Sequence, residues 1–320
     1  MVSRFRVAYF GLPLGACLLT HDGHELALAV LPPIDAPGRR RLTRRSPSTR
    51  VLAAAAGLGT DENDGFGARV LAALERAAPD LLVSWFWTRR LPATWLACAR
   101  FGGIGVHPSL LPRHRGPNPY YASIDAGDRE TGVTVHTLTP EYDEGDILLT
   151  RSLSVGERDS WQLARALDRP SLALLREAVG RYARGEPPEP RAQSAEGVTW
   201  APEPDGDALH VEWNWPTARV LRRIRALAPV PGLGLEVEGL ELFATRAAEA
   251  GDYPSALEPG EAAVYGTPPR LVLRTGDGAI SVLRAVLPQE DDGPDAVLGP
   301  DELAAAVRSH LASRDTGDLG

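Results

Sequence analysis

The sequence predicts an α/β fold in two domains, a parallel sheet with helical crossovers followed by a smaller β domain. In the first half of the chain, apolar runs of strand length alternate with helical periods, a rhythm typical of parallel sheets. After a proline-rich stretch, short alternating strands replace that rhythm. The chain has 320 residues, of which 43% are hydrophobic, so it is long enough for two domains that each bury a core.

The first half alternates between expected strands and helices. The expected strands cover residues 6–10, 26–31, 80–87 and 104–107, and the expected helices cover 65–78 and 93–100. The first strand is expected to lead into a tight turn, because a glycine and a proline follow it. Asp159 and Ser160 form an N-cap signal for a later helix that runs to about Arg184, and Pro170 predicts a break within it.

The composition changes at residues 185–206, a polar and proline-rich stretch that we expect to link two domains. The first domain is accordingly assigned to residues 1–184 and the second to residues 207–320. A small β barrel or open sheet with one helix is the expected architecture of the second domain. Its expected elements are a helix at 217–227 and strands at 271–274 and 280–287, on either side of a turn at 275–278.

Composition excludes several kinds of chemistry. All 34 basic residues are arginine, so neither a Schiff-base lysine nor a lysine-containing phosphate loop is present. Cys17 and Cys98 are too few for a disulfide framework or a four-thiolate zinc site, and they indicate a reducing, cytoplasmic setting. No metal site is predicted, and no apolar run approaches the roughly 18 residues of a membrane helix.

The charge is unevenly distributed along the chain. The net charge is −8, and residues 205–320 alone contain 10 arginines and 19 acidic residues, a balance of −9. An acidic second domain argues weakly against its binding a phosphate backbone.

The most informative segment surrounds His107. A short apolar strand ends there, and Pro108 keeps His107 extended, so its imidazole is expected at the carboxyl edge of a sheet, where ligands bind in α/β folds. Downstream, the acidic turn 141–146 precedes an apolar strand at 147–149. A carboxylate of this turn, such as Asp143, could orient the ring for acid–base chemistry. A hydrogen-bonded core histidine and a solvated turn are the plainer interpretations.

Several motifs together resemble the formyltransferases that use 10-formyltetrahydrofolate. The resemblance begins with the run His-Pro-Ser-Leu-Leu-Pro at 107–112, which is followed by Arg-Gly at 115–116. It extends over nearly the whole chain in similar order and spacing. The other matching segments are residues 10–13, 126–128, 131–134, 143–148, Trp213, 222–232 and 274–279.

The resemblance implies a Rossmann-like formyltransferase domain with an OB-like β barrel at the carboxyl end. The implied reaction moves a formyl group from 10-formyltetrahydrofolate, a co-substrate, to an amine through a tetrahedral intermediate. Of the family's Asn, His and Asp, His107 and Asp143 match by position, whereas Gly105 stands where the Asn is expected. Loss of such an oxyanion donor costs about 10²–10³ in rate in other enzymes. Either another donor replaces it, with Asn118 as our candidate, or His107 works alone, or the site no longer catalyses.

Further residues are assigned to the two substrates. The folate is expected to contact Gly105, Ser109, Leu110, Leu111, Pro112, Trp85 and Trp87. The two tryptophans share a face if the strand alternates through both, although core packing is the plainer interpretation. The acceptor is expected near Gly11, Pro13, Tyr120 and a basic loop that contains Arg39, Arg40 and Arg41. This loop suits phosphate contacts, but it also fits a solvated surface loop.

Three functions stay open at this point. The first, slightly favoured, is formyl transfer to a small-molecule amine such as an amino sugar, an amino acid or a hydroxylamine. The second is a divergent methionyl-tRNA formyltransferase, with initiator tRNA as partner. The third is a folate-binding protein without turnover. No pattern in the sequence indicates the oligomeric state or a membrane partner.

Overall fold

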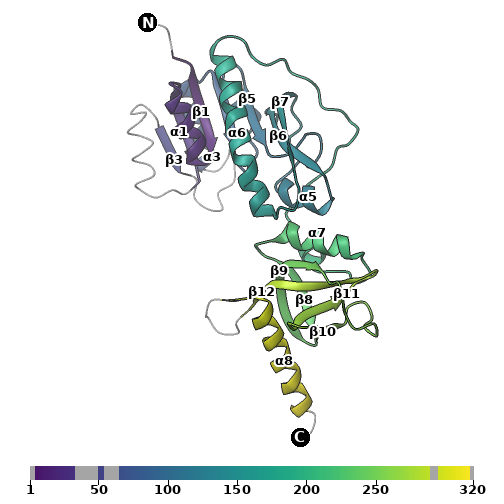
Figure 1. Ribbon diagram of the computed structural model, residues 1–320. Helices are drawn as coiled ribbons and strands as arrows, with labels where there is room; N and C mark the ends of the chain where they lie inside the picture. The colour runs from purple at the N-terminus through teal and green to yellow at the C-terminus, as the bar shows by residue number, and fades with distance from the viewer. Residues whose placement is uncertain (1–3, 33–49, 54–64, 289–294, 318–320) are drawn as a thin grey trace. The chain divides into compact units, whose positions relative to one another are not determined.

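The computed structural model describes residues 4–32, 50–53, 65–288 and 295–317 (Figure 1). The chain divides into two compact units, each with one sheet. The first unit comprises Met1–Pro119, Glu130–Ser154 and Arg165–Ala201, and the second comprises Tyr120–Arg129, Val155–Ala164 and Pro202–Gly320.

The first unit is built on a 7-stranded sheet with the order β3-β2-β1-β4-β5-β6-β7. Strands β1 to β5 are parallel, whereas β6 and β7 are antiparallel to their neighbours. From β1 the chain adds β2 and β3 on one side, and it then returns to add β4 and β5 on the other side. Open α/β sheets bind ligands where this direction changes, here between β1 and β4. The strands are β1 (Arg6–Gly11), β2 (Glu25–Leu31), β3 (Arg50–Ala53), β4 (Leu81–Trp85), β5 (Gly103–His107), β6 (Glu130–Thr137) and β7 (Ile147–Ser154).

Helices cover both faces of this sheet. Alternate residues of its central strand β1 are therefore buried on opposite sides. Ala8 and Phe10 pack into a core cluster with residues of α3 and α4. Tyr9 points the other way, and a Cβ on Gly15 of α1 would lie 2.4 Å from its hydroxyl oxygen. The helices of this unit are α1 (Pro13–His21), α3 (Gly65–Ala77), α4 (Ala93–Leu96) and the part of α6 (Ser160–Ala183) from Arg165 onward, whereas all of α5 (Pro119–Asp125) but its first residue groups with the second unit.

The predicted break at Pro170 is wrong, because α6 continues through it. A proline inside a helix costs about 3 kcal/mol or more. Leu167 and Leu174, on either side of the proline, are almost fully buried, and burial of each such side chain contributes about 1.5–3 kcal/mol. The Ser171 hydroxyl also donates to the Asp168 carbonyl at 2.8 Å. The burial of the two leucines and this local hydrogen bond outweigh the loss of the backbone N–H that proline lacks.

The parallel strands β1, β2, β4 and β5 and the long helices α3 and α6 were predicted better than the remaining elements of the first unit. The turn expected after β1 is in fact the helix α1, which begins with Pro13 at its first position, a placement that suits proline. Strand β4 and helix α4 end earlier than expected, at Trp85 and Leu96. Strands β3 and β6 were not anticipated.

The second unit contains a curled antiparallel sheet with the order β10-β11-β12-β9-β8, and β13 pairs with β12 (Figure 1). With the parallel sheet of the first unit, this confirms the predicted α/β fold class. In the described part of residues 207–320, two α-helices accompany the sheet rather than the expected one, because α8 follows β13. The elements are α7 (Thr217–Leu227), β8 (Leu233–Val237), β9 (Leu240–Glu249), β10 (Ala262–Tyr265), β11 (Arg270–Arg274), β12 (Ala279–Leu287), β13 (Ala296–Leu298) and α8 (Pro300–Gly317), with a short 3-10 helix at Gly206–Leu209.

Candidate active site

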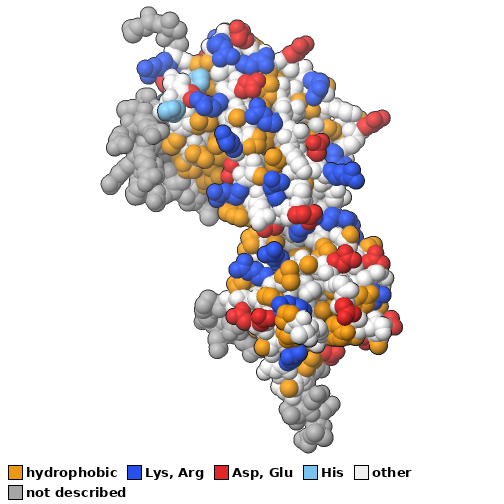
Figure 2. All heavy atoms as spheres, in the orientation of Figure 1, with side chains coloured by type: hydrophobic (Ala, Val, Ile, Leu, Met, Phe, Trp, Pro, Cys, Tyr) orange, Lys and Arg blue, Asp and Glu red, His pale blue; other side chains and the backbone are white. Residues whose placement is uncertain are grey.

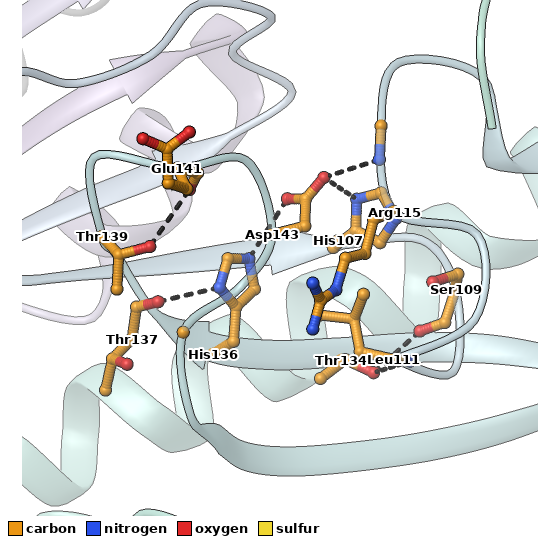
Figure 3. Close-up of polar contacts among 12 residues, drawn as sticks. His107, Ser109, Leu111, Arg115, Thr134, His136, Thr137, Thr139, Glu141 and Asp143 are labelled. Carbon is orange, nitrogen blue, oxygen red and sulfur yellow. Dashed lines mark hydrogen bonds and ion pairs between the residues drawn. The ribbon is translucent and has the colours of Figure 1, made fainter. Parts of the chain in front are cut away.

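His107 ends strand β5, and its imidazole lies between two oxygen atoms. The residue is only 6% exposed. Its Nε2 lies 2.7 Å from the carbonyl oxygen of His114. Its Nδ1 lies 3.5 Å from Oδ2 of Asp143 (Figure 3). The predicted approach of Asp143 to His107 is therefore confirmed.

The Asp143 carboxylate lies between two imidazole rings. The residue adopts a left-handed turn conformation with φ 55°, which is uncommon for a residue other than glycine. Its Oδ2 also accepts a hydrogen bond from the backbone N–H of Gly116 at 2.9 Å. Its Oδ1 lies 3.5 Å from Nε2 of His136 (Figure 3). The two carboxylate oxygens thus serve different partners.

These contacts set the charge state of the site. Burial alone raises the pKa of Asp143. The rings of His107 and His136 and the Gly116 N–H outweigh burial, and they hold the pKa of the carboxyl well below its usual range. Burial lowers the pKa of His107, an effect that Asp143 and the His114 carbonyl oppose only in part. At neutral pH an ionised carboxylate therefore lies beside a neutral imidazole that is able to accept a proton.

His136 is a residue of this cluster that sequence reasoning missed. It is 2% exposed, and it is the register partner of Gly105 across β5 and β6. Its Nδ1 lies 2.8 Å from the Thr137 carbonyl oxygen, while its Nε2 faces Asp143. Only the register of β6 against β5 reveals this position, and β6 itself was not predicted.

Gln193 and Arg115 form a second layer around the acidic turn, and Gln193 was also missed. The Gln193 amide donates to the carbonyl oxygens of Asp143 and Gly145, both at 2.7 Å. Arg115 donates to Oε1 of Gln193 at 2.9 Å and to Glu144 at 3.0 Å. Gln193 lies in the segment predicted as a linker, which contains no helix or strand pattern that would indicate a site.

The loop after His107 is closed by Thr134 of β6. The Thr134 hydroxyl donates to the Ser109 carbonyl at 2.8 Å and accepts from the Leu111 N–H at 3.2 Å (Figure 3). The Ser109 hydroxyl donates to the Arg113 carbonyl at 2.7 Å. These bonds fix the backbone of the loop that contains Leu110 and Pro112.

The expectation that Trp85 and Trp87 share a face is wrong. Strand β4 ends at Trp85, and Phe86 has a φ of 55°, so the strand alternation stops there. The Trp85 indole N–H donates to the Ser171 hydroxyl of α6 at 3.0 Å. The Trp87 ring instead packs edge-on against Phe10, with ring centroids 5.8 Å apart. Trp87 thus lies against the core cluster that Phe10 forms with residues of α3 and α4.

The remaining predicted site residues lie in several different parts of the chain. Gly11 ends β1, and a Cβ there would lie 1.7 Å from the Trp85 carbonyl oxygen. Tyr120 begins the part of α5 that groups with the second unit. The Asn118 N–H donates to the Ala201 carbonyl at 3.0 Å. Pro13 begins α1, and Arg39, Arg40 and Arg41 lie outside the described residues.

Two kinds of feature are absent from the described residues. No group of three or more histidine, cysteine, aspartate or glutamate side chains is arranged to hold a metal ion there. None of the helices in that part of the chain has the length and apolar character needed to cross a membrane.

Both units match known families. Residues 14–178, which include His107, His136 and Asp143, match the formyl transferase family, and residues 207–291 match the formyl transferase C-terminal domain. A methionyl-tRNA formyltransferase of Ralstonia nicotianae is 30% identical over 302 residues, which cover 90% of this chain and 92% of the relative.

Solved structures show the same fold. HypX from Aquifex aeolicus, in complex with tetrahydrofolic acid, matches 93% of this chain with a TM-score of 0.62 and 21% identity. The match spans 46% of the HypX chain, so this chain covers about half of that longer protein. WlaRD, a sugar 3N-formyl transferase, matches 88% of this chain and 98% of its own length, with a TM-score of 0.64 and 11% identity.

Proposed function

Because this chain belongs to the formyltransferase family, we propose that it transfers the formyl group of 10-formyltetrahydrofolate to the amine of a small molecule. The observation that supports the site is the Asp143 carboxylate held 3.5 Å from the buried His107 ring. A buried acid–base pair with shifted pKa values at the carboxyl end of a central strand is typical of a catalytic site.

The chemistry follows from the charge states of these two residues. The acceptor nitrogen attacks the formyl carbon, and a tetrahedral intermediate forms. Neutral His107 takes the proton that the acceptor nitrogen loses, and Asp143 stabilises the resulting imidazolium. When the intermediate collapses, the bond from the formyl carbon to the folate nitrogen breaks, and His107 returns the proton to that nitrogen. The acceptor leaves as a formamide, and the protein is unchanged.

Two buried donors beside the site fit the polar ring atoms of a folate. The indole nitrogen of Trp87 and one terminal nitrogen of Arg89 are buried, and the described residues offer them no acceptor. Such donors are costly unless a ligand or water satisfies them. They follow β4, and the neighbouring Arg90 forms an ion pair with Glu141 of the acidic turn at 3.3 Å. We assign the pterin ring, which carries several acceptor atoms, to these donors.

The second unit supports a small acceptor. Acidic and arginine side chains are mixed over its face in Figure 2, rather than gathered into a basic patch. Several of its arginines are used internally: Arg223 binds Asp125 at 2.6 Å, Arg270 binds Asp301 at 2.5 Å, and Arg225 lies 3.7 Å from Glu157. An arginine paired in this way contributes little to a phosphate contact.

Initiator tRNA is the second candidate acceptor. A methionyl-tRNA formyltransferase covers 90% of this chain, across both units. This candidate makes a distinct prediction, because binding to a phosphate backbone weakens steeply as salt increases. A small uncharged amine would show little such dependence.

The test measures the loss of the formyl group from 10-formyltetrahydrofolate as a change in absorbance. Amino sugars, amino acids and hydroxylamines are supplied in one series, and methionyl initiator tRNA in another. We expect turnover in the first series and at least a 10²-fold loss in His107→Ala, as for removal of a general base. His21→Ala is the matched control, because His21 is an exposed histidine at the end of α1. Turnover with tRNA alone would select the second candidate, and no turnover with any acceptor would reject both.

A further inference from the structure

Trp200 presents an exposed indole ring beside the catalytic pair. Its exposed fraction is 54%, although tryptophan is on average one of the more buried residue types. The ring lies over Gly116, because a Cβ added there would lie 3.0 Å from its Cε2 and Cζ2 atoms. The backbone N–H of Gly116 is also the group that donates to the Asp143 carboxylate. A single backbone residue therefore separates this exposed ring from the catalytic carboxylate.

Backbone hydrogen bonds fix the position of Trp200. Its segment pairs in parallel with the loop of the active site, where Trp200 is the bridge partner of Arg115. The Arg115 N–H donates to the Thr199 carbonyl at 2.9 Å, and the Ala201 N–H donates to the Arg115 carbonyl at 2.7 Å. A ring held on a fixed backbone loses less conformational freedom when a ligand stacks on it.

Tyr142 and Trp200 form a continuous aromatic surface, here called the aromatic shelf. Their ring centroids lie 6.3 Å apart, and the Arg90 guanidinium lies 4.9 Å from the centroid of the Tyr142 ring. The Tyr142 hydroxyl donates to the Thr88 carbonyl at 3.4 Å, within the loop whose buried donors are assigned to the pterin. The Tyr142 end of the shelf therefore adjoins the folate side of the site, which leaves the Trp200 end for the acceptor.

The charge beside the shelf favours a cation. Four of the six residues at 141–146 are acidic. Arg90 lies 3.3 Å from Glu141, and Arg115 lies 3.0 Å from Glu144, so both arginines are already paired. Four carboxylates against these two guanidinium groups leave the turn negative. A negative surface attracts a cationic ligand and repels a phosphate.

We propose that the aromatic shelf binds a ring of the acceptor, and that the acceptor is an arylalkylamine without a phosphate group. The proposal rests on the proposed function and names the class of small molecule that the site accepts. Aromatic rings stack on one another, and an ammonium group is attracted both to the acidic turn and to the face of a ring. The ammonium loses its proton to water before the nitrogen attacks the formyl carbon. Trp200 is then a residue that sets acceptor specificity.

Three amines of the same charge separate ring stacking from simple electrostatic attraction. Phenethylamine carries an aromatic ring, 2-cyclohexylethylamine carries a saturated ring of similar size, and ethanolamine carries none. We expect kcat/KM to be about 10-fold higher for phenethylamine than for the cyclohexyl compound, the upper range for an aromatic contact. A nucleoside diphosphate amino sugar supplies a planar base with negative charge, and we expect it to be a poorer substrate than phenethylamine. Equal rates with the two rings, or a preference for the nucleotide, would overturn the proposal.

Variants of Trp200 test the shelf itself. Trp200→Ala should raise KM for phenethylamine about 10-fold and leave kcat nearly unchanged, because it removes binding that the substrate and the transition state share. Trp200→Phe keeps an aromatic face and should retain most of the affinity. Trp161→Ala is the matched control, since Trp161 is 59% exposed and belongs to the second unit.

Ethanolamine distinguishes substrate binding from support of the catalytic turn. It has no ring to stack, so Trp200→Ala should leave its kcat and KM unchanged. A fall in kcat with ethanolamine would show that the indole instead supports Asp143 through Gly116, and the shelf would then have no role in binding the acceptor.

Binding measured without turnover keeps this test apart from that of the proposed function. An NMR titration gives the Kd of phenethylamine for the wild-type protein and for Trp200→Ala. We expect about 10-fold weaker binding to the variant. An equal Kd, or no binding to either protein, would reject the shelf as an acceptor site. If the wild-type protein binds phenethylamine through Trp200 but transfers no formyl group to any amine, the proposed function fails and the shelf remains a binding site for arylalkylamines.

Discussion

The side-chain amide of Gln193 holds the backbone of Asp143 at the outer side of the acidic turn. Its Nε2 lies 2.7 Å from the Asp143 carbonyl oxygen, across a separation of 50 residues. The same nitrogen lies 2.7 Å from the Gly145 carbonyl oxygen. Because Asp143 adopts an unfavourable left-handed conformation, these bonds help to keep the carboxylate directed at His107.

We predict that Gln193→Glu lowers kcat by about 10–100-fold. A carboxylate is nearly the same shape as the amide, but it cannot donate to two carbonyl oxygens, so the turn loses its anchor. Formyl release measured beside Tm checks this, and Ser194→Ala, a change at the exposed neighbouring residue, is the control. Wild-type kcat in Gln193→Glu would show that the turn keeps its conformation without the amide.

The rate should also depend on pH through His107. Catalysis requires the neutral ring, and its pKa lies below the ordinary value of about 6.5, so the rate should be constant near neutrality and fall at lower pH. Asp143 raises the pKa of His107, and Asp143→Asn should therefore move this acid limb to still lower pH while reducing the maximal rate about 10²-fold. The pH profile of kcat in both proteins is the measurement. A limb that moves upward in Asp143→Asn would contradict the assignment.

The same pKa shifts predict a loss of stability in acid. The pKa of His107 is lowered on folding, so the unfolded chain binds this proton more readily than the folded one below about pH 6.5. The pKa of Asp143 is also lowered, and its contribution to stability is present above about pH 4 and lost as the pH falls further. We expect Tm to decrease in two stages as the pH is lowered. Burial also lowers the pKa of His24. His107→Asn should therefore reduce the first stage, and a first stage of unchanged size would show that His107 does not contribute to it.

Sequence reasoning located His107 and Asp143 because local signals mark both of them. A strand that ends at His-Pro and an acidic turn before an apolar strand are visible without knowledge of the tertiary structure. The central strands were predicted for the same reason, since buried parallel strands are continuous apolar runs. The predicted break at Pro170 was wrong because the sequence shows the local cost of a proline in a helix, whereas the packing that outweighs this cost comes from residues distant in the chain.

His136 and Gln193 could not be found in this way. His136 faces Asp143 only because β6 pairs with β5 in one particular register, and a shift by one residue would turn the ring to the other face. Gln193 lies in an irregular segment whose contacts depend on the folded position of the acidic turn. Both residues stabilise a neighbour that was predicted. Residues that act through another residue have the weakest sequence signal.

A last prediction concerns the stability of the second unit, where Arg223 is 6% exposed. Its guanidinium binds both carboxylate oxygens of Asp125, at 2.6 and 3.0 Å, and it stacks over the Trp215 ring at 4.9 Å. Arg223→Met should destabilise this unit by about 3 kcal/mol, the lower end for a broken buried pair, because it leaves the half-buried Asp125 carboxylate without its partner. Arg308→Met, at an exposed position of α8, should be nearly neutral. Calorimetry measures both changes. The double variant Arg223→Met with Asp125→Leu should recover most of the loss, since no unpaired charge remains. If it does not, the stacking on Trp215 rather than the ion pair accounts for the stability.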